Sequence, residues 1–150
     1  MAERASLKTL IDLAQEGLEG AGRHLRGLMD ERRSAEQQLS MLQGYRMDYV
    51  ERLQRAGELG ISASNYQNFN RFIATLDQAI MQQNKVLAQL DIQVNTGREH
   101  WRDQKKRLNS FEALESRHQQ QLQHRENRAE QRRYDEHSAI LYRRRQQQNH

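Results

Sequence analysis

The side chains of this sequence best suited to chemistry are its histidines, but their spacing argues against a metal site. They stand at positions 24, 100, 118, 124, 137 and 150. No two are four residues apart, the interval that places two imidazole ligands on one helix face, and the chain has no cysteine to supply thiolates. The histidines are therefore interpreted as surface residues, and no bound metal is expected.

Catalytic motifs are also missing from the sequence. It contains no GxxxxGK[ST] phosphate loop, no nucleophile elbow and no HExxH zinc motif. The glycines at 17, 20, 22 and 27 follow no strand pattern, so we expect them to weaken a helix whose N-terminal stretch stays frayed until it binds. The sequence predicts a protein that is not an enzyme and takes no cofactor or small-molecule substrate.

The arginine-rich C-terminal segment has two interpretations. Residues 117–150 contain eight arginines against four Asp and Glu, which accounts for the whole net charge of +4. The arginines could neutralise phosphates while Tyr134 or Tyr142 stacks on bases, as in a nucleic-acid-binding coiled coil. Acidic residues at 126, 130, 135 and 136 interrupt them, which favours a solvated helix face or one that meets an acidic protein surface. Nucleic acid binding remains the alternative function.

Helices must position these side chains, because a heptad pattern dominates the sequence. Positions 7, 14, 21, 28, 35, 42, 49 and 56, with the interleaved 11, 18, 25, 32, 39, 46 and 53, are apolar at thirteen of fifteen places. A second seam runs from Phe69 to Phe111. Each seam needs a covering helix. Arg32 and Arg46 interrupt the first seam and are interpreted as residues that fix the register of pairing.

One turn separates the two seams. Gly57 and Gly60 interrupt the pattern, and Ser62 and Ser64 can cap a following helix. The sequence therefore predicts an all-α fold, a long two-helix antiparallel coiled coil (helical hairpin) with an extended C-terminal helix. We expect one coiled-coil domain over 1–150, with helices at about 5–57 and 63–145, a turn at 57–63 and a basic, unpaired tail at 117–150.

In such a hairpin the numbers of facing residues sum to about 121. Leu7 then faces Leu114, after which the second seam breaks down and roughly 25 to 30 residues project unpaired. The same rule gathers Leu42, Tyr45 and Tyr49 opposite Ala79, Leu76 and Phe72. Tyr45 and Phe72 lie one step beside the seams, so they either present aromatic surface to a partner or only widen the flank of the core.

Composition excludes several classes of protein. Only 35% of the 150 residues are hydrophobic, which is too few for a compact core but enough for a strip along paired helices. No apolar run approaches the roughly 20 residues of a membrane span, and the N-terminus lacks a signal-peptide block. A cytoplasmic protein is expected.

Several stretches resemble the FliJ family of the bacterial flagellar export apparatus. They are Gln38–Tyr45 with Tyr49, the turn Gly60–Ser62, Phe72–Ile80, the opening Met1–Glu3 and the pair Trp101–Arg102. The resemblance is strongest from about 36 to 107 and weakest in the tail. It implies a small cytoplasmic protein of the flagellar type III secretion system, similar in fold to the central stalk subunit of rotary ATPases.

The resemblance also implies partners. The end formed by the chain termini is expected to dock in the pore of the hexameric export ATPase. The other end is expected to reach the export gate protein FlhA, and the C-terminal part to bind export chaperones, all at the cytoplasmic face of the inner membrane. By motif, the gate-binding residues are Gln38, Leu42, Tyr45, Tyr49, Phe72, Leu76 and Ala79, while Gln83 stands where a histidine is expected. Such a protein would couple ATP turnover to gate opening.

Overall fold

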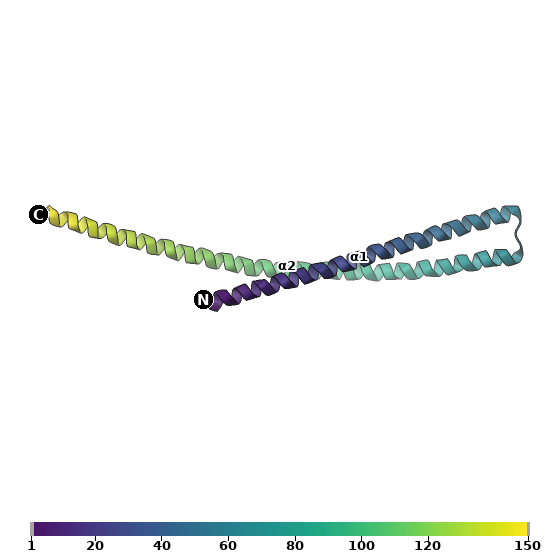
Figure 1. Ribbon diagram of the computed structural model, residues 1–150, viewed down its shortest axis with the longest axis horizontal. Coiled ribbons are helices and arrows are strands. Elements are labelled where there is room, and N and C mark those ends of the chain that lie inside the picture. The colour runs from purple at the N-terminus through teal and green to yellow at the C-terminus, as the bar shows by residue number, and fades with distance from the viewer. Residues whose placement is uncertain (1, 150) are drawn as a thin grey trace. The chain divides into compact units, whose positions relative to one another are not determined.

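The computed structural model describes residues 2–149 and consists of two long helices (Figure 1). α1 spans Ala2–Leu59 and α2 spans Ala63–Gln148, and no strand occurs within residues 2–149. The predicted all-α hairpin class is confirmed. Residues 1 and 150, which the predicted domain includes, lie outside the described residues. Within the same range, neither helix contains a stretch both long and apolar enough to cross a membrane.

Both helices extend beyond their predicted bounds. The chain contains no proline, so no residue removes a backbone donor or forces a kink over the 58 residues of α1 or the 86 of α2. Glu3 lies in the first turn of α1, where a carboxylate favours the positive end of the helix dipole. The Gln and Arg residues at the end of α2 are good helix formers, which explains why the helix continues to Gln148.

The turn between the helices is limited to residues 60–62. Gly60 has a φ of +85°, a conformation that a residue with a Cβ adopts at a cost. Ser62 caps α2: its Oγ accepts a hydrogen bond from the Asn65 N–H (3.2 Å), and its carbonyl accepts one from the Tyr66 N–H (3.0 Å). Gly57 lies inside α1 and Ser64 inside α2, so only one glycine and one serine of the predicted turn perform these roles.

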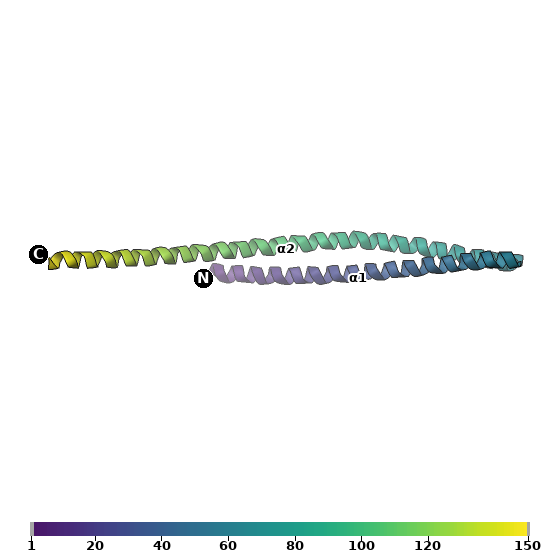
Figure 2. The ribbon, with the colours of Figure 1, turned by 90° about the horizontal axis from the view of Figure 1, so that it is seen from above.

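The tertiary contacts fall into two groups, each of which is described by itself. One lies within residues 16–104, where α1 and α2 run side by side from the turn in both views (Figures 1 and 2). The other joins residues 2–15 of α1 to the part of α2 that begins at residue 105. The prediction of a single domain stays a prediction.

The predicted seams are the buried faces of the helices. Fourteen of the fifteen positions in the first seam are buried or half-buried, Arg46 being the exception, and so are all thirteen heptad positions from Phe69 to Phe111. At the core of residues 16–104, Val94 is only 4% exposed. Gly97 allows the helices to approach closely, because a Cβ there would lie 3.4 Å from the Cδ1 atoms of both Leu25 and Leu28.

In the second group of contacts, residues 2–15 of α1 cover only the beginning of the α2 segment that starts at residue 105. Leu7 and Leu114 line one groove, as the pairing rule predicts. Beyond His118 the side chains of α2 are exposed as far as its end at Gln148, apart from the half-buried Leu122 and Ala129. This stretch, green to yellow in Figure 1, is helical without a covering helix.

Candidate functional site

The seven predicted partner-binding residues lie on the facing helices of residues 16–104, four on α1 and three on α2. At the end of this set nearest the turn, Tyr49 packs against Phe72, with ring centroids 4.3 Å apart and an interplanar angle of 38°. Tyr49 also approaches Phe69, with centroids 6.2 Å apart. With Tyr45, one helical turn before Tyr49, these rings form what we call the aromatic patch: Tyr45, Tyr49, Phe69 and Phe72.

The exposure of the predicted residues differs from one to the next. Tyr45 is 50% exposed and Phe72 is 42% exposed, as expected for positions beside the seams. Leu42, Tyr49 and Ala79 are half-buried, and Gln38 is exposed. Leu76 is only 6% exposed and therefore belongs to the core beneath the patch. The rings that a partner can reach most readily are those of Tyr45 and Phe72.

Polar groups surround the aromatic patch. A shallow groove of about 240 Å³ is lined by Tyr49, Phe69 and Phe72 together with Asn65 and Asn68. The Arg52 guanidinium lies over the Tyr49 ring, 5.3 Å from its centroid, in a cation–π arrangement. Exposed aromatic anchors with a polar rim are typical of protein–protein contact surfaces.

Gln38 is held in place by a glutamine on the other helix. The Gln83 side-chain amide donates to the Ala35 carbonyl (3.0 Å) and to Gln38 Oε1 (3.2 Å). The acceptor of the Gln38 amide is thus engaged within the hairpin, which leaves its NH₂ group as the donor that a partner can use. Gln83, which stands where a histidine is expected, therefore has a structural role in this chain, because it joins α2 to α1.

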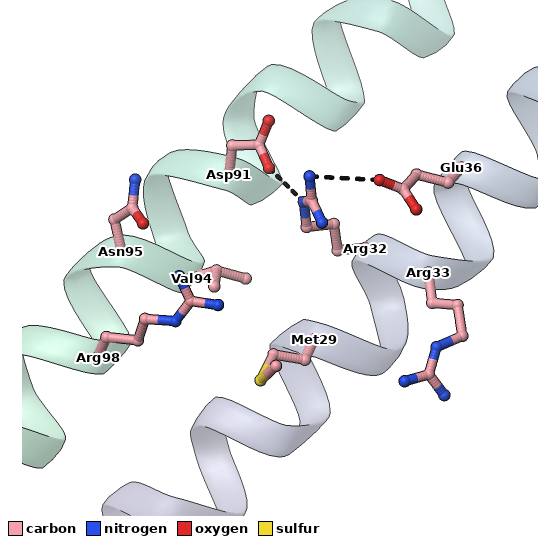
Figure 3. Close-up of a pocket in the computed structure, with 8 residues that line it drawn as sticks. All are labelled: Met29, Arg32, Arg33, Glu36, Asp91, Val94, Asn95 and Arg98. Atoms are coloured by element: carbon pink, nitrogen blue, oxygen red, sulfur yellow. Dashed lines mark hydrogen bonds and ion pairs between the residues drawn. The ribbon is translucent and has the colours of Figure 1, made fainter.

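Two cross-helix ion pairs explain the charged residues in the first seam. Arg32 pairs with Asp91 and, along its own helix, with Glu36 (Nη2–Oε1 3.2 Å), as Figure 3 shows, and Arg46 pairs with Asp77. The hydrogen bond to Asp91, followed by the charges of Asp91 and Glu36, raises the pKa of Arg32. The heptad pattern gives no sign of either aspartate, although each lies two residues from the position that the 121 rule indicates.

A second apolar surface lies where α1 begins. Leu7, Leu10, Leu114 and His118 line a groove of about 440 Å³, which we call the terminal groove. Leu10 is 38% exposed and Leu114 is 50% exposed, so the groove presents apolar side chains to solvent. Exposed apolar side chains clustered around a groove favour contact with another protein.

Among residues 2–149, the titratable side chains form no constellation of the kind that binds a metal. Within residues 2–149, no three His, Asp or Glu side chains come together in a way that would hold an ion. His118 lines the terminal groove, and His24 and His100 line a groove beside Gly97 within residues 16–104. The groups assembled at the aromatic patch and the terminal groove are suited to binding proteins.

Comparison with known proteins places the sequence among flagellar proteins. The family model described as "Flagellar FliJ protein" matches residues 3–147. The Flagellar FliJ protein of Escherichia coli (strain K12) is 35% identical over 136 residues, covering 91% of this chain and 92% of that protein. The Flagellar FliJ protein of Salmonella typhi is 34% identical over 136 residues, with the same coverage of both chains.

Proposed function

This chain belongs to the FliJ family of flagellar proteins, and from that membership we propose that it serves flagellar protein export as a stalk and adaptor without enzymatic activity. It links the hexameric export ATPase to the export gate protein FlhA and binds export chaperones. It works in the cytoplasm at the flagellar base, peripheral to the inner membrane, and flagellum assembly requires it.

The observation that carries the proposal is the aromatic patch. Tyr45 and Phe72 keep 50% and 42% of their surface exposed in a chain where the seams already provide the packing that the helices need. Large aromatic side chains with exposed faces dominate the binding energy of many interfaces. We assign the gate contact to this patch, with Gln38 and the half-buried Leu42 and Ala79 extending it and Leu76 supporting it from the core.

The assignment is tested with the double variant Tyr45→Ala, Phe72→Ala and the purified cytoplasmic domain of the gate protein. Loss of two aromatic anchors is expected to weaken binding at least tenfold, because each such residue typically contributes more than about 1 kcal/mol. Titration calorimetry measures the affinity. Tyr134→Ala is the matched control, since Tyr134 is 70% exposed and lies in the tail. Unchanged affinity in the double variant would remove the patch from the gate interface.

The terminal groove supports the second contact, with the pore of the export ATPase. Its exposed leucines lie beside the start of α1, and Leu13, 55% exposed, adds further apolar surface on that helix. A pore that surrounds the start of α1 and the part of α2 beside it would bury these side chains. We assign the ATPase contact to this groove.

The variant Leu10→Asp tests the ATPase contact. A carboxylate in the groove cannot be buried without a large desolvation cost, so stimulation of ATP hydrolysis by the purified export ATPase is expected to be lost. Met47→Asp, at a position 67% exposed within residues 16–104, is the control that keeps stimulation. Equal stimulation by both variants would contradict the assignment.

The alternative function is nucleic acid binding by the tail. It is favoured by the exposure of every arginine from Arg125 to Arg145. Salt titration separates the two functions, because binding to DNA or RNA loses orders of magnitude in affinity between about 50 and 200 mM salt. A stalk and adaptor shows no such binding and raises the activity of the purified ATPase.

A further inference from the structure

A groove on one side of the paired helices, within residues 16–104, is lined mainly by charged side chains (Figure 3). It has a volume of about 450 Å³. Three arginines line it, Arg32 and Arg33 from α1 and Arg98 from α2, against two carboxylates. None of these residues belongs to the aromatic patch or the terminal groove, so the functions proposed above leave the groove unexplained.

The two carboxylates are already engaged by one of the arginines. Arg32 binds both Asp91 and Glu36, so both carboxylates already have a partner within the hairpin, and Arg32 offsets one of their two negative charges. Arg33 has only a long contact with Asp30, Nη1–Oδ1 3.8 Å, between side chains that are 71% and 75% exposed. A pair this long and exposed contributes little to stability. Within residues 2–149, no ion pair engages Arg98. Two guanidinium groups are therefore available to a partner.

An apolar side chain lies between these two arginines. Figure 3 shows Arg98 reaching from α2 toward α1 and Arg33 projecting from the edge of α1 that faces away from α2; in this view Met29 lies between them. Met29 is 39% exposed. Methionine is flexible and polarisable, which suits it to packing against an incoming apolar side chain. The groove thus offers one apolar contact with a guanidinium group on either side.

We infer that the groove formed by Met29, Arg33 and Arg98 binds an acidic helical segment of a partner protein. Carboxylates of the segment pair with the two arginines, a geometry that guanidinium groups favour, and an apolar side chain between them contacts Met29. A protein segment fits better than nucleic acid because it can supply an apolar side chain for Met29 together with carboxylates for the arginines, whereas a line of phosphates has no apolar group to offer. The inference does not depend on the gate or ATPase assignments.

The experiment follows the methionine methyl groups of the full chain by ¹³C NMR. The probe is an amphipathic peptide of Glu, Ala and Leu of about 14 residues, roughly four helical turns, and the comparison peptide replaces every Glu by Gln. Met29 is expected to shift saturably with the Glu peptide alone. Met41, Met47 and Met81, which are 56%, 67% and 60% exposed, serve as internal controls, and the chemical shifts of their methyl groups are expected to stay unchanged.

Charge variants assign the effect to the groove. Arg33→Glu, Arg98→Glu is expected to weaken binding about tenfold or more, and Arg33→Gln, Arg98→Gln to weaken it less. The matched control is Arg26→Glu, Lys85→Glu, which makes the same change in net charge at two exposed positions on the same two helices. Circular dichroism checks that each variant remains helical. If the Glu variant loses its helical structure, the affinity of the Gln variant decides the test.

Several results would overturn the inference. One is a Met29 resonance that does not respond, or one that shifts together with all the other methionines. Another is equal binding by the charge-reversed variant and its control. A third is a single-stranded oligonucleotide that shifts Met29 at lower concentration than the Glu peptide, which would make the groove a phosphate site.

Discussion

Glycine has opposite roles at two positions in this chain. A Cβ at Gly27 would meet no atom within 4 Å, and the residue lies inside α1. Gly60, in contrast, has a φ of +85° in the turn. The variant Gly27→Ala is therefore expected to raise the free energy of unfolding by about 0.5–1 kcal/mol, because alanine loses less backbone entropy in a helix. Urea denaturation followed by circular dichroism measures the change.

Gly60→Ala is the opposing control. Alanine pays a steric penalty at positive φ, so this variant is expected to lower the free energy of unfolding by about 1 kcal/mol. The two variants make the same chemical change, so the sign of the effect depends only on backbone conformation. A loss of stability in Gly27→Ala would mean that the helix there is not formed in solution.

Arg32 and Arg46 show how much about cross-helix contacts can be predicted from the position of a single residue in the sequence. Their place in an apolar seam indicated a role in register, and each makes a cross-helix ion pair. Their aspartate partners were not predicted, because the 121 rule pairs positions along the two helix backbones, whereas a long arginine side chain reaches past the residue that faces it. For the same reason the groove around Met29 could not be predicted, since it depends on where the flexible Arg33 and Arg98 side chains end.

The start of α2 depends on one side chain. Ser62 Oγ accepts the hydrogen bond from the Asn65 N–H, whereas Ser64 lies within the first turn of the helix. Ser62→Ala is therefore expected to reduce the free energy of unfolding by about 1 kcal/mol, the usual cost of a lost N-cap. Ser64→Ala, the matched control, is expected to change stability by less than about 0.5 kcal/mol. Chemical denaturation of both variants decides whether the cap is specific to Ser62.

Helices were the most predictable part of this chain. A seam of apolar residues every three or four positions indicates a helix even where single residues have low helix propensity. The seams correctly predicted the buried faces and the pairing of Tyr49 with Phe72. Exact ends were less predictable, because Gly57 is tolerated within α1 when nothing requires it to break the helix. Phe69 was assigned to the seam and not to the site, although its position three residues before Phe72 places both rings on one face.

The tail tests how stability is distributed along the chain. Side chains beyond His118 are exposed apart from the half-buried Leu122 and Ala129, so they bury little apolar surface. Truncation after His118 is expected to leave the midpoint of thermal unfolding within about 2 °C of the full chain, while reducing the helical signal. Differential scanning calorimetry with circular dichroism measures both. A large drop in the midpoint would show that the tail contacts the paired helices in solution.

The order in which the chain folds follows from its single turn. Arg46 and its partner Asp77 are 31 residues apart in sequence, and Arg32 and Asp91 are 59 apart. Bringing distant residues together directly costs entropy that grows with the intervening length, whereas each pair adjacent to one already formed closes only a few more residues. Folding is therefore expected to begin next to Gly60 and to advance outward from it, and the pairs farthest from Gly60 are expected to open first under stress.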